Sequence, residues 1–91
     1  MLPDFNDRPT GRRFAVEGEV VLNFDDTVPR EIRGQFLDFG RDGFRVIHSY
    51  VGLVSGQSVY YHHVLAKGTA KVVWNRIIGE MVETGFIIIG E

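Results

Sequence analysis

Residues 14–24 read Phe-Ala-Val-Glu-Gly-Glu-Val-Val-Leu-Asn-Phe, and this stretch decides the fold class. Its large apolar side chains fall mostly on alternate positions, namely Phe14, Val16, Val20, Leu22 and Phe24. Successive side chains of a β-strand point to opposite faces, so this alternation is typical of a strand with one buried face. We therefore expect a strand that begins at Phe14 and packs against a core.

Five further strands are expected downstream, separated by residues that favour turns. The expected strands are Ile32–Asp38, Phe44–Ser49, Ser58–Leu65, Thr69–Ile78 and Glu80–Ile89, with a loop at Tyr50–Gln57. No segment shows a capped helical pattern. Short strands joined by glycine-bearing turns predict an all-β fold, either a six-stranded antiparallel barrel or a sandwich.

Length and composition favour one small globular domain. The chain has 91 residues, of which 44% are hydrophobic and 24% charged, a balance that argues against disorder. Residues 1–13 read as a flexible, irregular N-terminal arm and residues 14–91 as the barrel domain. No apolar run approaches the ~18 residues of a membrane span, and the N-terminus lacks the apolar stretch of a signal peptide. Since cysteine is absent, we expect a reduced, cytoplasmic protein.

The charge is mildly acidic overall but unevenly distributed. The formal net charge is −2, whereas Arg8, Arg12 and Arg13 lie close together in the arm. Proteins that hold a long nucleic acid usually carry a basic excess. A local cationic patch on an acidic body suits a small anion better than a long polyanion.

The first candidate site is this arginine arm, in which Arg8 and Arg12 spell R-x-x-x-R with Arg13 directly behind. Guanidinium groups bind phosphate oxygens in bidentate fashion and stack on aromatic bases. Each hydrogen bond to a charged group contributes roughly 1.5–3 kcal/mol, so two arginines on one phosphate could supply much of a micromolar affinity. The alternative is that the arm is simply solvated basic surface.

The second candidate site is the segment Asp38-Phe39-Gly40-Arg41-Asp42-Gly43. Its two glycines suit a tight turn that needs positive φ. The carboxylate of Asp38 could accept two hydrogen bonds from the edge of a guanine. The alternative is an ordinary hairpin turn in which Asp38 caps its own backbone.

Together the two segments resemble the PilZ domains, small six-stranded split β-barrels that bind the second messenger cyclic di-guanylate (cyclic di-GMP). That family has R-x-x-x-R just before its first strand and [D/N]-x-S-x-x-G between its second and third strands. Arg8 and Arg12 match the first motif by spacing, and Asp38 and Gly43 match the ends of the second. The resemblance covers roughly residues 8–89, through the segments Arg13–Val16, Gly43–Val46, Ala70–Trp74 and Gly85–Ile87.

The resemblance implies a role for each matching residue. Arg8 and Arg12 would hold phosphate and stack on base, Asp38 would meet a guanine edge, and Gly43 would let the turn close against the ligand. Gly40 stands where the family has serine, which removes a hydroxyl contact of about 0.5–1.5 kcal/mol. Arg41 could compensate from the turn.

The register of the arm leaves two alternatives open. The family often places its second arginine directly before the first strand, where this chain has Arg13. Four residues before Arg13 stands Pro9, so Arg13 would act without its usual partner. In the other alternative the arm is shifted by one residue, and Arg8 and Arg12 act together.

Other polar residues give weaker patterns. His62 and His63 are adjacent, so on a strand they point to opposite faces and cannot chelate one metal ion together. We expect Tyr60 and Tyr61 to divide in the same way, and Trp74 to pack in the core beside Val72. No set of carboxylates or histidines suggests acid–base catalysis, so we expect no enzyme and no cofactor.

The sequence therefore predicts a small cytoplasmic receptor for cyclic di-GMP that signals through a protein partner it does not identify. One alternative is a PilZ-like adaptor that no longer binds nucleotide. Another is an unrelated small barrel that binds RNA or DNA, although such a protein would carry aromatic and basic residues together on its strands. The apolar run Phe86–Ile89 is either an exposed edge for homodimerisation or docking, or a buried last strand.

Overall fold

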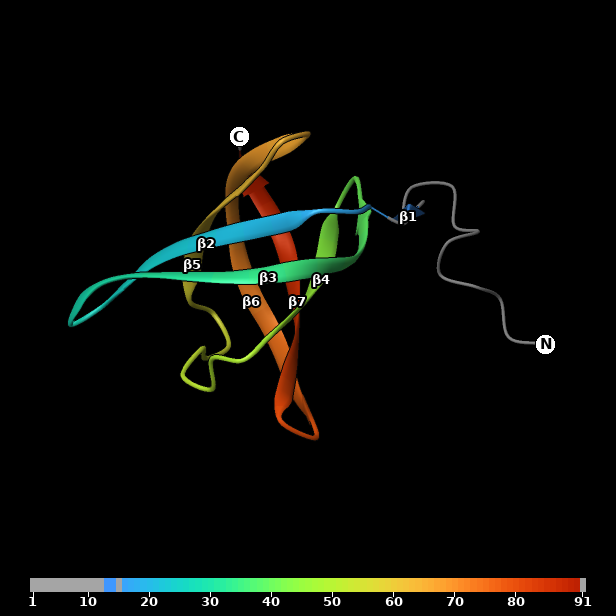
Figure 1. Ribbon diagram of the computed structural model, residues 1–91. Helices are drawn as coiled ribbons and strands as arrows, with labels where there is room; N and C mark the ends of the chain where they lie inside the picture. Colours follow the sequence, from blue (N-terminus) through green and yellow to red (C-terminus); the bar gives the residue numbers. More distant parts are fainter. Residues whose placement is uncertain (1–12, 15, 91) are drawn as a thin grey trace.

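The computed structural model describes residues 13, 14 and 16–90, and for residues 13 and 14 only the backbone is considered (Figure 1). The described residues form seven β-strands and no helix, so they include no helix that could cross a membrane. The strands are β1 (Arg13–Phe14), β2 (Glu19–Asp26), β3 (Val28–Gly40), β4 (Gly43–His48), β5 (Ser58–His63), β6 (Ala66–Ile78) and β7 (Met81–Gly90).

Six of these strands close into an antiparallel barrel, as the sequence predicts. The hydrogen-bonded order is β3-β2-β5-β6-β7-β4, and pairing of β3 with β4 closes the ring. The short β1 pairs with the end of β3 outside this ring. Closure leaves each barrel strand paired on both sides over part of its length, which removes most exposed sheet edges. The segment Phe86–Ile89 belongs to β7, which lies between β4 and β6, so it is a paired strand and not an edge.

The core follows the predicted alternation. Val20, Leu22 and Phe24 of β2 are buried, and the polar positions between them face outward. An aromatic cluster fills one end of the barrel, with ring centroids 4.7–5.6 Å apart between the pairs Phe44–Tyr61, Phe44–Phe86, Phe36–Phe44 and Phe39–Phe44. Tyr61 and His63 are buried while Tyr60 and His62 are exposed, which confirms that each adjacent pair divides between the two faces.

The first expected strand is interrupted, because the chain bends between β1 and β2. Gly18 lies at this bend with φ of +105°, a conformation that L side chains rarely adopt. A Cβ atom at Gly18 would also lie 2.9 Å from Nε2 of His63. The alternation that continues through Val16 therefore conceals a sharp bend.

Two other strand predictions need correction. β3 starts at Val28 rather than Ile32, because Thr27 makes the turn with φ of 63° and Pro29 is accommodated in the ladder opposite Asp25. Trp74 does not pack in the core: it is 40% exposed. The register of β6 against β7 shifts between Val72 and Trp74, so this bulge turns the indole to the outer face, where it lies over Gly85.

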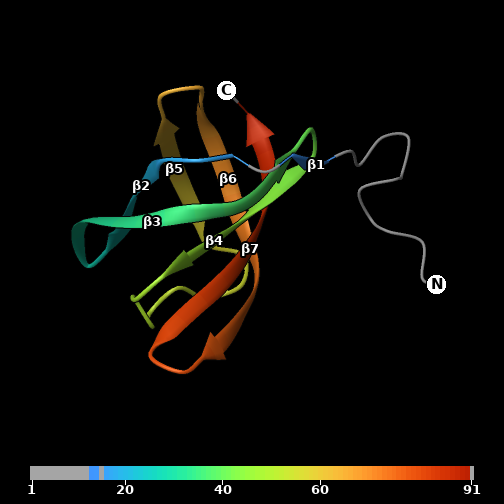
Figure 2. The ribbon, with the colours of Figure 1, turned by 45° about the vertical axis from the view of Figure 1, so that its right-hand side comes forward.

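The two ends of the barrel differ. At one end lie the β3–β4 turn, the β5–β6 turn, the C-terminal end of β7 and β1 (Figures 1 and 2). At the other end lie the β6–β7 turn and the loop of residues 49–57. The arm of residues 1–12 lies outside the described residues, but β1 fixes the point at which it joins the barrel.

Candidate ligand-binding site

A hollow of about 570 Å³ opens at the first of these ends, which we call the barrel mouth. The β3–β4 turn (Gly40, Arg41) forms one side, the β5–β6 hairpin the other, and Phe39 and Tyr61 belong to its lining. The ring centroids of Phe39 and Tyr61 lie 6.2 Å apart, so the mouth has an aromatic floor. Volumes of this size, with aromatic and a few polar linings, are typical of sites for small ligands.

His63 fixes the geometry of the mouth. Its Nδ1 accepts a hydrogen bond from the backbone N–H of Leu65 (3.0 Å), and so the proton of the neutral ring lies on Nε2. Nε2 then donates to the carbonyl oxygen of Glu17 (2.7 Å). The buried ring of His63 thus ties the β5–β6 turn to the segment that follows β1. Both of its nitrogens are used in these two hydrogen bonds, so we assign His63 a structural role.

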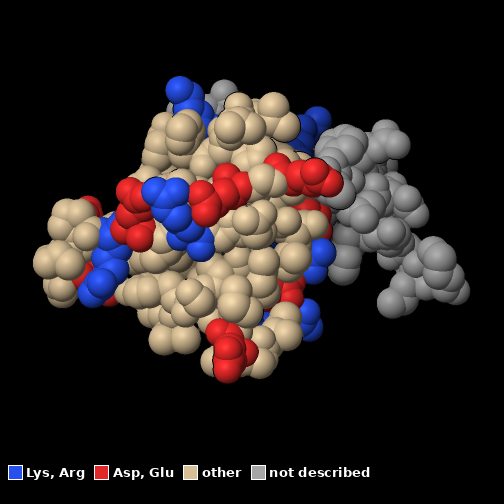
Figure 3. Space-filling model, viewed as in Figure 1, with Lys and Arg blue, Asp and Glu red and all other residues tan. Residues whose placement is uncertain are grey.

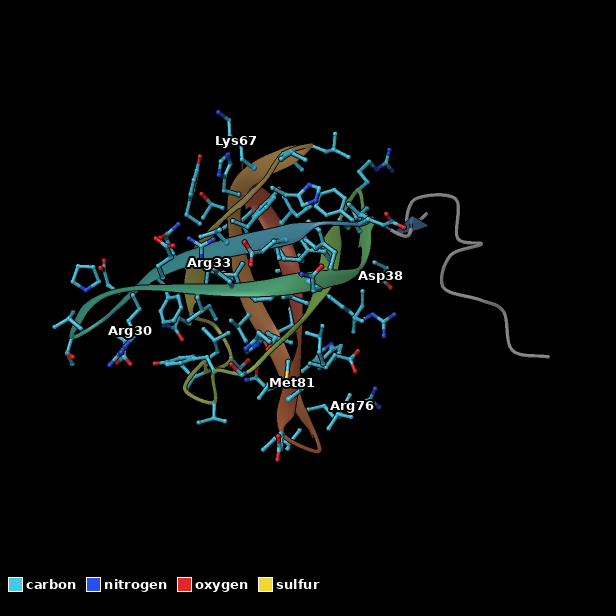
Figure 4. All side chains as sticks on the ribbon, viewed as in Figure 1. Arg30, Arg33, Asp38, Lys67, Arg76 and Met81 are labelled. Atoms are coloured by element: carbon cyan, nitrogen blue, oxygen red, sulfur yellow. The ribbon has the colours of Figure 1, made fainter. Side chains whose placement is uncertain are left out.

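The lining of the mouth is cationic. Arg41, His62 and Lys67 are exposed, and the described residues that line the hollow include no carboxylate. Within residues 16–90, neither Arg41 nor Lys67 forms an ion pair. In Figure 4 the side chain of Lys67 points outward at the upper end of the barrel, and the same place in Figure 3 shows blue with no red beside it.

The face below this edge is different, since blue and red side chains lie next to one another along its strands (Figure 3). Arg33 there bonds Glu19 at 2.9 Å and Glu31 at 3.0 Å. At the mouth, by contrast, Arg41 and Lys67 have no carboxylate partner among the described residues.

The backbone of Arg13 lies at the rim of the mouth. Arg13 pairs with Gly40, and Phe14 pairs with Phe39, so β1 runs directly along the residues that line the hollow. Arg8 and Arg12 lie outside the described residues. The described residue that follows them in the chain, Arg13, lies at this rim.

Asp38, the predicted guanine contact, takes part in an ion pair instead of lining the hollow. It is 9% exposed, and its Oδ2 accepts from both Nε (3.0 Å) and Nη2 (2.7 Å) of Arg45. A bulge between Phe36 and Asp38 in the β3–β4 pairing brings Asp38 opposite Arg45. Of the predicted turn motif, Gly40 and Arg41 thus line the mouth, whereas Asp38 lies behind it on the outer face of the barrel.

Asp38 begins a charge ladder that crosses four strands, which we define as Asp38 (β3), Arg45 (β4), Glu83 (β7) and Arg76 (β6). Arg45 Nη1 donates to Glu83 Oε2 at 2.8 Å, and Arg76 Nη2 donates to Glu83 Oε1 at 2.6 Å. Glu83 is only 1% exposed. Asp38 and Arg76 mark the two ends of the ladder in Figure 4.

The ladder determines the ionisation of its members. Burial by itself would raise the pKa of the Glu83 carboxyl, but the hydrogen bonds and charges of Arg76 and Arg45 outweigh burial and lower that pKa. The hydrogen bond to Asp38 raises the pKa of Arg45. Sequence inspection missed Arg45, Glu83 and Arg76, because Arg45 and Glu83 are 38 positions apart and no local spacing links them.

Gly43 is required by packing and not by a positive φ. A Cβ atom there would collide with the carbonyl oxygen of Phe86 on β7. Neither Gly40 nor Gly43 has a positive φ, which corrects the expectation that this turn uses its two glycines for that conformation. Gly43 therefore lets β4 approach β7 closely at the base of the β3–β4 turn.

A second buried histidine forms an uncharged polar chain away from the mouth. His48 Nδ1 accepts from the Tyr50 N–H (3.1 Å), so Nε2 donates to Thr84 Oγ1 (2.6 Å). Thr84 Oγ1 in turn donates to Asn75 Oδ1 (2.6 Å). Burial lowers the pKa of His48. Both ring nitrogens of His48 are therefore used in hydrogen bonds inside the fold.

Metal binding finds no support within the described part of the chain. No group of three or more histidine, aspartate or glutamate side chains lies close enough to hold an ion there. The polar side chains at the mouth are instead suited to an anion, since they are donors and cations.

Comparisons with protein-family models and with curated proteins gave no match. The resemblance to PilZ domains therefore stands on the quoted motifs, and the fold that accompanies them is a six-stranded antiparallel barrel.

Proposed function

We propose that this protein binds cyclic di-GMP at the barrel mouth, between the arginine arm and the β5–β6 hairpin. It would act as a small cytoplasmic receptor rather than as an enzyme. Phosphate would be held by Arg8, Arg12 or Arg13 from the arm and by Arg41 from the β3–β4 turn. A guanine would lie against the aromatic floor formed by Phe39 and Tyr61.

The observation that carries this proposal is the pairing of β1 with the end of β3. Arg13 lies opposite Gly40, a lining residue of the hollow. Two segments that the resemblance assigns to one ligand, 27 positions apart in the chain, are therefore adjacent at a cationic opening. That adjacency supports a shared anionic ligand. It is independent of the sequence motifs, which say nothing about how the two segments pair.

Electrostatics supports the same assignment. Arg41 and Lys67 form no ion pair within residues 16–90, so an incoming phosphate would not have to displace a carboxylate from either of them. Charge-assisted bonds to phosphate are among the stronger hydrogen bonds of proteins. They offset the missing hydroxyl at Gly40.

Asp38 has a more restricted role in this proposal. Its Oδ2 already accepts two hydrogen bonds from Arg45, so contact with a guanine edge would require this oxygen to be shared or exchanged. We therefore assign Asp38 first to holding the β3–β4 turn. The guanine contact is an exchange that ligand binding would drive.

Binding would change the surface that a partner meets. Phosphate would neutralise the arm arginines and draw the arm over the mouth, because their mutual repulsion falls once the anion is present. A protein partner, or a second copy of the chain, would then bind the surface formed by the closed mouth.

Isothermal titration calorimetry with cyclic di-GMP tests the proposal. We expect micromolar affinity for the wild type and a loss of at least tenfold for Arg12→Ala. Arg33→Ala is the matched control, because it removes the same charge from an exposed ion pair with Glu19 and Glu31. Absence of heat from the wild type at ligand concentrations of about 100 μM would contradict the proposal.

An adaptor function is the second candidate, and the β6–β7 hairpin favours it. Ile77 is 71% exposed and Ile78 46% exposed near its tip, at the end of the barrel opposite the mouth. Exposed apolar residues gathered in this way often mark a protein contact. Recovery of the same partner with and without cyclic di-GMP would favour the adaptor over the receptor.

A further inference from the structure

The β5–β6 hairpin forms the side of the mouth that no family motif covers. Its two-residue turn, Val64 and Leu65, is 89% and 78% exposed, and both residues line the hollow. Lys67 follows on β6 and lines the same hollow. One hairpin therefore presents two bare aliphatic side chains and one cation to the opening.

We infer that this hairpin is the second wall of the ligand site, resting on the proposed function for the identity of the ligand. Lys67 contacts a phosphate of the bound cyclic dinucleotide. Val64 and Leu65 cover the exposed face of a base. The β3–β4 turn, with Gly40 and Arg41, holds the ligand from the opposite side.

The position of Lys67 supports its part. It lies directly opposite His62 in the β5–β6 ladder, and both side chains are exposed. No carboxylate lines the hollow among the described residues, and Lys67 has no ion pair there. A lysine on a flexible four-carbon stem reaches a nearby phosphate without rearrangement of the strand. On the other side of the hollow Arg41 supplies a cation, so Lys67 would allow a phosphate to be held from both sides.

The aliphatic turn supports the second part. Turn tips are usually polar, and two adjacent side chains of this size at 89% and 78% exposure leave apolar surface in water. A purine has an apolar face and a polar edge, so it can cover the turn while its edge and its phosphate meet donors. A free phosphate ion could use Lys67 but not Val64 or Leu65, and this distinguishes a nucleotide from a simple anion.

The hairpin is held rigidly enough to serve as a wall. His63 accepts from the N–H of Leu65 and donates to the carbonyl of Glu17, which anchors the turn to the segment after β1. The ring of His63 also packs 5.1 Å from that of Phe36 in the core. A ligand would therefore meet a preformed surface, which lowers the entropic cost of binding.

Two variants test the inference by calorimetric titration with cyclic di-GMP. Lys67→Ala should weaken binding about tenfold, and the double change Val64→Ser with Leu65→Ser should weaken it about threefold to tenfold. Lys71→Ala is the matched control: it removes the same charge four residues along β6, from an exposed position that does not line the hollow. All three changes lie at exposed positions, and their unfolding midpoints should match the wild type.

Inorganic pyrophosphate provides a second probe. Lys67→Ala should weaken the binding of pyrophosphate. The double serine variant should bind pyrophosphate with unchanged affinity, because pyrophosphate has no base to cover the turn. Equal weakening of cyclic di-GMP binding by Lys67→Ala and Lys71→Ala would overturn the inference, since it would indicate long-range charge alone.

The outcomes also separate this inference from the proposed function. If the wild type binds and Arg12→Ala does not, but the hairpin variants bind like the wild type, only the inference fails. If the wild type binds no cyclic di-GMP, the proposed function fails and the inference fails with it.

Discussion

Two pairs of cations in this barrel have opposite surroundings. Arg45 and Arg76 on the outer face contact Glu83, a carboxylate that is 1% exposed, and Arg45 also holds Asp38. Arg41 and Lys67 at the mouth have no carboxylate partner within residues 16–90. The first pair compensates the charge of a carboxylate that the fold buries. The second pair compensates none inside the described chain, and because both side chains line the hollow we propose that they serve a ligand.

The physical reason for the difference is burial. A carboxylate taken out of water is strongly destabilised unless cations and hydrogen bonds compensate it, so Glu83 needs both of its arginines. An exposed cation loses no hydration and needs no partner. The same residue type is therefore structural in one region and available for binding in the other.

The largest effect expected from this comparison is the loss of stability in Arg45→Met. The change leaves Asp38 without its two hydrogen bonds from Arg45 and leaves Glu83 with Arg76 as its one partner from the ladder. We expect the free energy of unfolding to fall by about 2–3 kcal/mol, measured by urea denaturation. The magnitude lies below that of a fully buried pair because the Arg45 side chain is 39% exposed.

Arg33→Met is the control for this measurement. Arg33 also bonds two carboxylates, but all three side chains are about half exposed. Such pairs contribute little, so the control should change stability far less than Arg45→Met. Equal losses in the two variants would show that burial is not what separates the two regions.

The next effect concerns Arg41, which we expect to contribute to ligand affinity but not to the stability of the fold. Arg41→Ala should weaken cyclic di-GMP binding about tenfold and leave the unfolding midpoint unchanged. Arg30→Ala removes an equal charge from the exposed pair with Asp26 and should change neither quantity appreciably. A lower unfolding midpoint for Arg41→Ala would mean that this cation, too, serves the fold.

The sequence predicted the barrel well because the relevant signal is local. Alternation places Val20 and Leu22 in the core by the two-residue period of a strand, and turn residues separate the strands. The same period failed at Trp74, where a bulge inserts one residue and moves the indole to the other face. A bulge depends on the partner strand, so alternation within one strand cannot reveal it.

The candidate site was likewise predictable only where its residues are close together in the sequence. Gly40 and Arg41 reach the mouth because they lie in the turn that the sequence marked. Asp38 and Arg45 are seven positions apart, but their contact depends on the bulge after Phe36. The link from Arg45 to Glu83 depends on closure of the barrel through β7. Contacts that form when the barrel closes join residues far apart in the sequence. No sequence motif marks such contacts, so only the three-dimensional structure reveals them.

The smallest effect extends the comparison to an uncharged buried group. Burial lowers the pKa of His48 below its ordinary value of 6.5. The unfolded chain therefore binds a proton more readily than the folded one, and protonation favours unfolding. The contribution of neutral His48 to stability is complete above pH 6.5 and is lost as the pH falls through 6.5 toward the folded pKa. We expect the free energy of unfolding to fall as the pH is lowered from 7.5 to 5.5.

His48→Gln isolates this contribution. Glutamine can donate to Thr84 Oγ1 but does not titrate, so the variant should be less stable than the wild type at pH 7.5 and lose less stability on acidification. Urea denaturation at closely spaced pH values gives the difference between wild type and variant, in which the contributions of the carboxylates cancel. If that difference stays constant from pH 7.5 to 5.5, His48 accepts its proton in the folded barrel as readily as in the unfolded chain, and burial does not keep it neutral.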